Sequence, residues 1–314
     1  MSSTGVASTT LGTTAASSAA AARTVRARRP RRRRVGAVGA NPVARTVAFV
    51  LATVWLVIVL FPIYYMVLAS FRTQGEYLSG NPWLPVGGLS LSSYGTVFSA
   101  TGLGTDFRNS TVVTVATIIV VVLFSLGAAY RIVRRGSRFA AVSFRLILFG
   151  LAVPIQAIII PIFIFCVKLH IYDTLLAVVL AASASLIAVA VLLMVNYLRA
   201  IPRELFDAMS VDGAGEWTTF TRLVWPLARP VLGVVSIFAG LGAWNNFLIP
   251  LILTQSNSNT VLPVGLFRVA STSEYGIDVP VVMGAVLLSV LPLVLLYIGL
   301  RRQFVAGLGG LAIR

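Results

Sequence analysis

Six long apolar segments divide this chain, and they limit its possible folds more than any other feature. They cover roughly residues 46–71, 110–130, 146–167, 174–198, 230–254 and 279–300, with Asp, Glu, Lys and Arg only at their extreme ends. A helix needs about 20 apolar residues to span the core of a bilayer. Of the 314 residues, 58% are hydrophobic and 11% are charged, whereas soluble domains are about a quarter charged. The sequence therefore predicts an all-α, multi-pass membrane protein with six transmembrane helices.

The net charge of +16 is explained by membrane topology. Lys and Arg number 21 in the N-terminal tail, after the second span, between spans four and five, and at the C-terminus, against four in the remaining segments. Loops that stay in the cytoplasm carry an excess of Lys and Arg. Both termini are therefore predicted to be cytoplasmic, and no nucleic-acid partner is needed to explain the charge.

Residues 1–45 are predicted to form a disordered, basic cytoplasmic tail, because Ser, Thr, Ala and Gly are followed by the run "RTVRARRPRRRR" at 23–34. A twin-arginine export signal would need a short apolar region and a cleavage site, but the next apolar segment is a full span. A nucleic-acid-binding arm is a second alternative. We favour a charge that retains the tail in the cytoplasm and contacts anionic lipid.

The residue types that most enzymes and metal sites require are scarce. The chain has one histidine, His170, one cysteine, Cys166, and one lysine, Lys168. A zinc pair of the H-E-x-x-H kind and a phosphate loop of the G-x-x-x-x-G-K-[ST] kind are both excluded. No ionisable residue lies at membrane depth, where a proton-coupled carrier would need one. We therefore predict no catalytic residue, no metal site and no cofactor in this chain, and any energy for uphill transport would enter from another chain.

Four amide side chains are the candidate polar points of the membrane region: Gln156, Asn196, Asn245 and Asn246. Gln156 lies between two prolines of the third span, and the two asparagines are adjacent within the fifth. Amides in lipid cost free energy unless they are paired. Two interpretations stay open, namely hydrogen bonds between helices and the lining of a translocation path.

The segment 199–229, between spans four and five, is predicted to form two short helices with a sharp bend. Pro202 suits the first turn of a helix, which places Glu204 and Asp207 near its positive end. The sequence "DGAG" at 212–215 breaks this helix, and Gly213 is free to adopt a positive φ.

A second short helix is predicted to begin near Glu216, and Pro226 marks the return of the chain to the membrane. It places Trp217, Phe220 and Val224 on one stripe. This apolar face either packs against the ends of the chain's own spans or docks a partner protein.

The same segment resembles the motif E-A-A-x-x-x-G-x(9)-I-x-L-P of the inner-membrane permease subunits of ABC importers. The matching positions are Asp207, Ala208, Met209, Gly213, Leu223, Trp225 and Pro226. Asp207 stands where Glu is usual, Met209 where the second Ala is usual and Trp225 where Leu is usual. The stretches "AWNNFLIPLIL" and "LRRQFVAGLGG" resemble the carbohydrate, maltose-type branch, with Asn246 in place of a frequent Asp.

This resemblance implies an importer-type permease fold over residues 46–314 and half of a sugar translocation path in a bacterial plasma membrane. It implies four kinds of partner: a second permease, giving a heterodimer, two ATP-binding subunits that hold ATP and Mg, an extracytoplasmic solute-binding protein, and the sugar. The loop 199–229 would couple to the ATPase through Glu204, Asp207, Ala208, Gly213, Ala214, Trp217, Phe220 and Pro226.

Two alternatives remain at this stage. One is a permease of another ABC branch, for amino acids or peptides, against which the W-N-N-F stretch argues. The other is a self-contained secondary carrier or channel, which inverted repeats or intramembrane charges would favour. Neither of these features is seen in the sequence.

Overall fold

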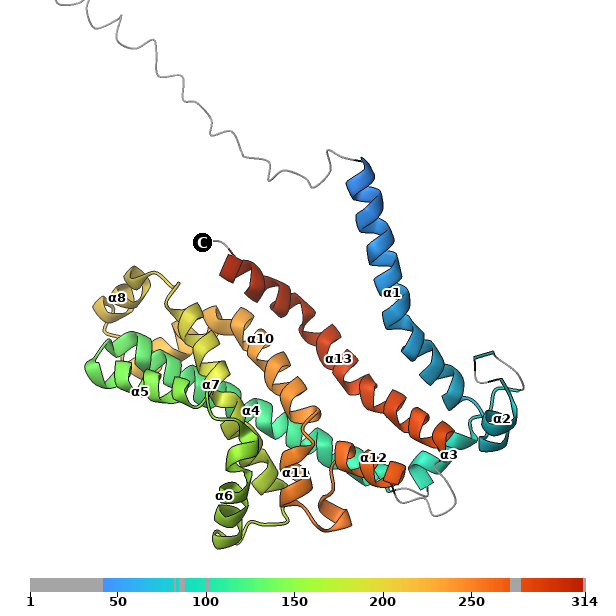
Figure 1. Ribbon diagram of the computed structural model, residues 1–314. Helices are drawn as coiled ribbons and strands as arrows, with labels where there is room; N and C mark the ends of the chain where they lie inside the picture. The colour runs from blue at the N-terminus through green and yellow to red at the C-terminus, as the bar shows by residue number, and fades with distance from the viewer. Residues whose placement is uncertain (1–41, 82, 85–87, 100–101, 272–277, 313–314) are drawn as a thin grey trace, which may run out of the picture. The chain divides into compact units, whose positions relative to one another are not determined.

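The computed structural model describes residues 42–81, 83–84, 88–99, 102–271 and 278–312, without the side chains of residue 135 and residues 302–312. Contacts divide the chain into two units, Met1–Val59 and Leu60–Arg314. The described part of the first unit is the beginning of helix α1, and the second unit carries all the other elements (Figure 1). The predicted tail falls almost entirely on residues 1–41, outside the described residues, and positions 42–45 are already helical.

All regular secondary-structure elements among the described residues are helices, as the all-α prediction requires. The α-helices are α1 (Pro42–Ser70), α2 (Gln74–Ser79), α3 (Ser92–Ser99), α4 (Leu103–Arg135), α5 (Arg138–Phe149), α6 (Ile155–Lys168), α7 (Leu175–Leu198), α8 (Arg203–Val211), α9 (Glu216–Thr219), α10 (Trp225–Trp244), α11 (Leu248–Leu253), α12 (Leu262–Ser271) and α13 (Val279–Ala312). A π-helical turn, η1 (Phe220–Val224), joins α9 to α10, and a 3₁₀ turn, η2 (Asn257–Asn259), precedes α12.

Five helical segments among the described residues are long and apolar enough to cross a membrane: Pro42–Ser70, Leu103–Arg134, Leu175–Leu198, Glu216–Trp244 and Val279–Arg301. The predicted third span, 146–167, instead falls on the end of α5 and on α6, which has 14 residues. The break has a local cause, because Gly150 ends α5 and Pro154, which has no N–H to donate, precedes α6.

The core of the second unit is built on α4, α7 and α10, which pack against one another (Figure 1). Its largest cluster of buried side chains includes Leu126 of α4, Met194 of α7 and Val235 of α10, each fully buried. The α8 helix contributes one residue, Phe206, to the same cluster. The loop that contains α8 is therefore anchored in the core that the three long helices share.

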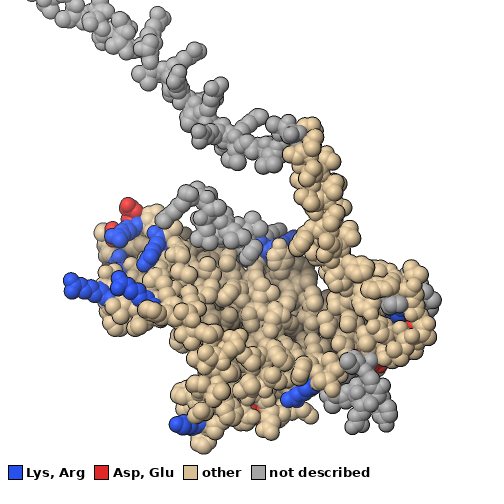
Figure 2. All heavy atoms as spheres, in the orientation of Figure 1, with Lys and Arg blue, Asp and Glu red and all other residues tan. Residues whose placement is uncertain are grey.

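Charged side chains are distributed unevenly over this unit. On the face drawn in Figure 2, arginines gather at the end where α5 and α8 lie, and the wide area beside them is mostly uncharged. This pattern is typical of a helix bundle whose middle faces lipid and whose ends face water.

A close approach between α4 and α12 depends on Gly265. Asp106, in the first turn of α4, is 6% exposed, and a Cβ built on Gly265 would overlap its Oδ2 atom. The sequence analysis did not identify this acid, because the predicted span begins at residue 110 and α4 begins at Leu103.

We expect Gly265→Ala to destabilise the protein, because the added methyl group must displace the buried Asp106 side chain. Overpacking of this kind costs about 1–3 kcal/mol. Thermal unfolding of the purified protein in detergent measures the effect. Gly127→Ala is the matched control, since no atom lies within 4 Å of the position of its Cβ. An equal melting temperature for Gly265→Ala and the control would contradict this account of the packing.

Asp173, in the turn between α6 and α7, holds that turn against the loop after α11. Its Oδ1 atom accepts hydrogen bonds from the backbone N–H of Gln255 (2.8 Å) and from the N–H and hydroxyl of Ser256 (3.1 Å each). Its backbone carbonyl accepts a bond from the Asn259 amide at 2.6 Å. The hydrogen bond from the Gln255 backbone, followed by those from Ser256 and Asn259, lowers the pKa of Asp173 below its ordinary value.

We expect the stability of the protein to fall as the pH drops through the lowered pKa of Asp173. The folded state favours the ionised carboxylate, so its stabilisation is present above the unfolded pKa of about 4 and is lost below it. The variant Asp173→Asn should show a smaller loss of melting temperature between pH 6 and pH 3 than the unaltered protein. Asp212→Asn, at an exposed acid after α8, is the control. If Asp173→Asn keeps the full pH dependence, this carboxylate does not stabilise the turn.

Candidate functional site: the loop between α7 and α10

The loop between α7 and α10 contains one separate short helix, α8, rather than the two that were predicted. Pro202 precedes α8 as its cap residue, one position earlier than predicted, and Glu204 lies in the first turn. The predicted second helix does begin at Glu216, but α9, η1 and α10 continue as one helical span to Trp244. Because Pro226 cannot donate to the carbonyl of residue 222, the preceding turn widens into the π-helical η1 instead of ending the helix.

The predicted bend at Gly213 is confirmed. Gly213 has a φ of +71°, and two hydrogen bonds close the end of α8, from the Gly213 N–H to the Ser210 carbonyl (3.1 Å) and from the Ala214 N–H to the Met209 carbonyl (2.9 Å). This pair of bonds is the Schellman motif, which needs a left-handed residue at the position of Gly213. The bend therefore has a defined geometry, set by one glycine.

The α8 helix is amphipathic, with one side chain in the core and most of the others facing outward. Phe206 is 7% exposed and packs in the core, whereas Glu204, Asp207 and Ala208 are exposed. Leu205 and Val211 are also exposed large apolar residues. The helix is thus held by one aromatic side chain and presents acids and apolar groups outward.

The predicted stripe of Trp217, Phe220 and Val224 passes from solvent into the core. Val224 is fully buried, Phe220 is half-buried and Trp217 is 75% exposed. The rings of Trp217 and Phe220 stack at 5.7 Å between centroids, and Phe220 also contacts Tyr130 of α4 at 5.5 Å. The inner end of the stripe therefore packs against the chain's own helices, while its outer end is exposed and docking to a partner protein stays a prediction.

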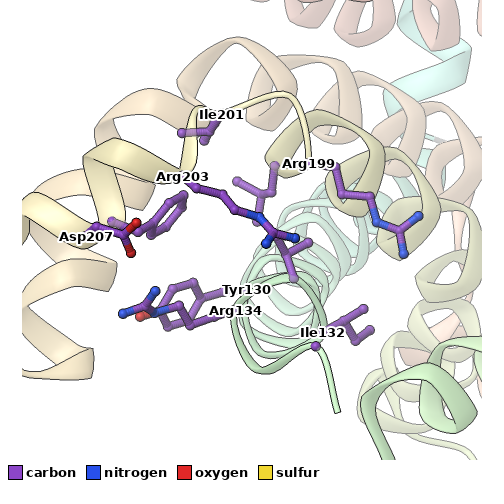
Figure 3. A pocket seen from close by; sticks show the side chains of 11 residues that line it. Tyr130, Ile132, Arg134, Arg199, Ile201, Arg203 and Asp207 are labelled. Atoms are coloured by element: carbon purple, nitrogen blue, oxygen red, sulfur yellow. The ribbon is translucent and has the colours of Figure 1, made fainter. Parts of the chain in front are cut away.

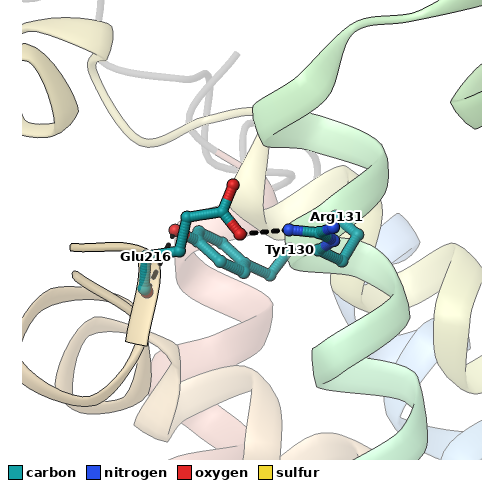
Figure 4. A network of polar contacts seen from close by, with 3 residues as sticks. All are labelled: Tyr130, Arg131 and Glu216. Carbon is teal, nitrogen blue, oxygen red and sulfur yellow. Dashed lines mark hydrogen bonds and ion pairs between the residues drawn. The ribbon is translucent and has the colours of Figure 1, made fainter. Parts of the chain in front are cut away.

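The C-terminal end of α4 contacts the loop on both sides of the bend. Arg131 forms an ion pair with Glu216, and the Tyr130 hydroxyl donates to the Glu216 carbonyl at 3.4 Å (Figure 4). Arg134 donates to the Ser210 hydroxyl at 2.8 Å and lies over the Phe206 ring, 5.8 Å from its centroid. The sequence analysis used these arginines only as a topology signal, since nothing in the sequence pairs residues about 80 positions apart.

A cavity of about 670 Å³ opens between the end of α4, the end of α7 and α8. Arg134, Arg199, Arg203 and Asp207 lie around it, together with the aromatic rings of Tyr130 and Phe206 (Figure 3). Three arginines and one aspartate give this wall a net positive charge. The cavity could accept an acidic group, while Asp207 offers one carboxylate to a basic group.

The four predicted path amides do not form one cluster. Gln156 lies in the first turn of α6, and Asn196 lies in the last turn of α7. The prediction that Asn245 and Asn246 lie inside a helix is wrong, because they occupy the break between α10 and α11. Among the described residues, no hydrogen bond joins any two of these amides.

The two asparagines satisfy the backbone at this break. The Asn245 amide donates to the Leu241 carbonyl at 3.0 Å, and the Asn246 side-chain oxygen accepts from the Ile249 N–H at 3.2 Å. These amides therefore cap helix ends in their own segment, in place of the bonds between helices that were considered.

The described residues hold no group of three or more His, Cys, Asp or Glu that could bind a metal ion. Cys166, on α6, is buried. The exposed face of the site offers carboxylates, at Glu204 and Asp207, and an apolar ring, at Trp217.

Comparison with known proteins places the chain in a family. Residues 122–308 match the model described as "Binding-protein-dependent transport system inner membrane component". The chain is 32% identical over 254 residues to the arabinooligosaccharides transport system permease protein of Halalkalibacterium halodurans, covering 80% of this chain and 90% of that protein. It is 30% identical over 270 residues to the multiple sugar-binding transport system permease protein of Streptococcus mutans, covering 85% of this chain and 96% of that protein.

A further relative and a solved structure agree with this match. The diacetylchitobiose uptake system permease protein of Streptomyces coelicolor is 29% identical over 257 residues, covering 82% of this chain and 85% of that protein. The fold matches a chain in the crystal structure of a bacterial ABC transporter involved in the import of the acidic polysaccharide alginate, with a TM-score of 0.75 and 22% identity, covering 83% of this chain and 96% of that chain. The importer-type permease fold is therefore confirmed.

These findings exclude the secondary carrier and the channel considered above. They also make the chain a membrane-embedded component that is not itself the enzyme of its transporter. The chain belongs to the family of inner-membrane permease components of binding-protein-dependent ABC transporters.

Proposed function

We propose that this permease imports a sugar or an oligosaccharide. The observation that carries the proposal is similarity along most of the chain to permeases named for arabinooligosaccharides, diacetylchitobiose and multiple sugars. The "AWNNFLIPLIL" stretch, which resembles the carbohydrate branch, supports the same substrate class. It disfavours the amino-acid and peptide alternative.

In the proposed assembly, the chain pairs with a second, non-identical permease subunit and forms half of the translocation path. Two ATP-binding subunits supply the energy and hold ATP and Mg, and an extracytoplasmic solute-binding protein delivers the sugar. The family description supports the binding protein, since it names a binding-protein-dependent system. The match to an ABC transporter chain supports the rest of the assembly at the level of fold.

We also propose the six-span topology with both termini in the cytoplasm of a bacterial cell. In this topology α5 and α6 together make the third span, and the loop 199–229 faces the cytoplasm. The distribution of Lys and Arg supports it, because α5 and the loop carry many of the arginines of the described chain.

The topology predicts which exposed positions react with a membrane-impermeant thiol reagent. In a Cys166→Ala background, Val211→Cys on α8 should be labelled only in inverted vesicles, and Ser258→Cys in the loop before α12 only in intact cells or spheroplasts. The physical reason is that the two positions lie on opposite sides of the bilayer. Labelling of both positions from one side would contradict the six-span arrangement.

Within the loop we assign the coupling role to the exposed face of α8 and to the bend that follows it. Glu204, Asp207 and Ala208 face outward and would contact an ATP-binding subunit. Trp217, 75% exposed, would fill an apolar site on that subunit. Gly213 and Ala214 set the angle between α8 and the membrane helix, and Phe220 and Pro226 form the joint with that helix.

Gln156, Asn196, Asn245 and Asn246 stay candidates for the translocation path. Asn245 and Asn246 are the strongest of them, because a helix break at membrane depth exposes backbone carbonyls, which are tolerated where they line a cavity.

The proposed coupling role makes a sharp prediction for Gly213. The variant Gly213→Val should lose most sugar uptake by the assembled importer, because a β-branched residue at positive φ is strained by about 1–2 kcal/mol or more. Gly213→Asn should retain more uptake, since Asn tolerates this conformation. Uptake of a labelled oligosaccharide into cells or proteoliposomes, with ATPase binding measured in parallel, tests both variants.

Gly215→Ala is the matched control, because Gly215 has an ordinary φ of −68° and open space around its Cβ position. The control should behave like the unaltered protein. Undiminished uptake in Gly213→Val, with unchanged ATPase binding, would overturn the coupling role of the bend. Failure of the unaltered importer to move any oligosaccharide would overturn the proposed substrate class.

A further inference from the structure

The C-terminal turn of α4 is joined to the coupling loop at several points, and we propose that Arg131 and Arg134 are positioning residues that make α4 and the loop one rigid body. In this proposal, movement imposed on α8 by an ATP-binding subunit enters the membrane domain through α4. The inference rests on the proposed coupling role of the loop, and it adds the helix that receives the movement.

The contacts lie on both sides of the Gly213 bend, which is the main argument for a rigid body. Before the bend, the Arg134 guanidinium donates to the Ser210 hydroxyl at 2.8 Å. After the bend, Arg131 pairs with Glu216. The C-terminal turn of α4 therefore contacts the loop both before and after the bend. These contacts restrain the angle at Gly213 in addition to the backbone conformation of Gly213 itself.

Aromatic contacts support the two polar ones. The Tyr130 ring lies 5.5 Å from the Phe220 ring, and its hydroxyl donates to the Glu216 carbonyl (Figure 4). The Arg134 guanidinium also covers the ring of Phe206, which is anchored in the core. The Arg131–Glu216 pair is about half exposed on both sides, and such a pair alone contributes little stability. In this proposal the pair holds the loop in position against α4, together with the other contacts of Tyr130 and Arg134.

The α4 helix is suited to carry a movement across the membrane. It runs over 33 residues without a proline, whereas α6, α10 and α13 each contain at least one and α10 also ends at the Asn245 break. It packs along α7 and against α10. A helix of this length spans about 50 Å, more than the hydrocarbon core.

The other end of α4 is fixed to the far side of the bundle. The Asn109 amide donates to the carbonyls of Ser258 (2.7 Å) and Thr260 (2.8 Å). The Ser110 hydroxyl accepts from the Leu262 N–H at 2.8 Å. A displacement of the Arg131 end would therefore reach the loop before α12 through one continuous helix.

The first test removes the two charges and then exchanges one ion pair, in the complete importer. The double variant Arg131→Gln with Arg134→Gln should lower the number of sugar molecules imported per ATP hydrolysed by at least about fivefold, a typical size for coupling between sites. Arg131→Glu alone should lower this ratio as well, and Arg131→Glu combined with Glu216→Arg should restore it to within about twofold. Arg138→Gln, at an exposed arginine that begins α5, is the control.

This ratio separates coupling from structure, because misfolding lowers uptake and hydrolysis together. Membrane insertion and ATPase binding are measured for each variant. An unchanged ratio in Arg131→Gln with Arg134→Gln would overturn the inference, and so would a charge exchange that inserts but does not restore coupling. The proposed function would survive either result, because the unaltered importer would still transport the sugar.

The second test does not depend on how well those variants fold. In a Cys166→Ala background, Arg134→Cys and Ser210→Cys are joined by a short bifunctional thiol reagent. If α4 and the loop move as one body, cross-linking leaves the uptake of this double variant no lower than before treatment, because the cross-link replaces the contact between positions 134 and 210. Loss of uptake on cross-linking, with no loss in either single-cysteine variant treated in the same way, would show that the loop must move relative to α4 and would overturn the inference.

Discussion

The need to satisfy every backbone hydrogen bond in lipid is the constraint on which the rest of this structure depends. It makes the chain helical, and it demands a specific device wherever a helix is interrupted. Residues 212–215 lie in the loop that we propose faces the cytoplasm, outside this constraint, and there the positive φ of Gly213 with its two closing bonds ends α8. At the break between α10 and α11 the device is the side chains of Asn245 and Asn246. Each interruption is therefore stabilised by specific hydrogen bonds. The proposed coupling role concerns the first of them, and the proposed translocation path concerns the second.

The loop between α7 and α10 shows how such an interruption becomes a joint. Phe206 secures it to the core, Gly213 gives it one angle, and α4 contacts it on both sides of that angle. A loop held in this way has few ways to move relative to its surroundings. Force applied to its exposed face would be passed on to the long helices, which is what a permease that takes energy from a separate ATPase requires.

Much of this could be predicted from the sequence, because the decisive signals are local. Apolar length identified the long helices, the sequence "DGAG" at 212–215 predicted the bend, and the spacing of Asp207, Gly213 and Pro226 indicated the family. The predicted spans 146–167 and 230–254 did not show the helix breaks at residues 150–154 and 245–247. Hydropathy is averaged over a whole span, so the few residues that end one helix and begin the next do not change it. The Arg131–Glu216 and Asn109–Thr260 contacts could not be predicted, because pairs separated by 85 and 151 positions leave no pattern in one sequence.

A distance measurement between spin labels on α8 and α4 tests the central claim, that these two elements move together, most directly. Labels at Val211 and Phe124, both exposed, would be compared in the assembled importer with and without bound ATP. A label pair from Val211 to the partner permease would report closure in the same sample. The account predicts that closure changes the second distance while the Val211–Phe124 distance stays within about 1–2 Å. A change of similar size in both distances would contradict it.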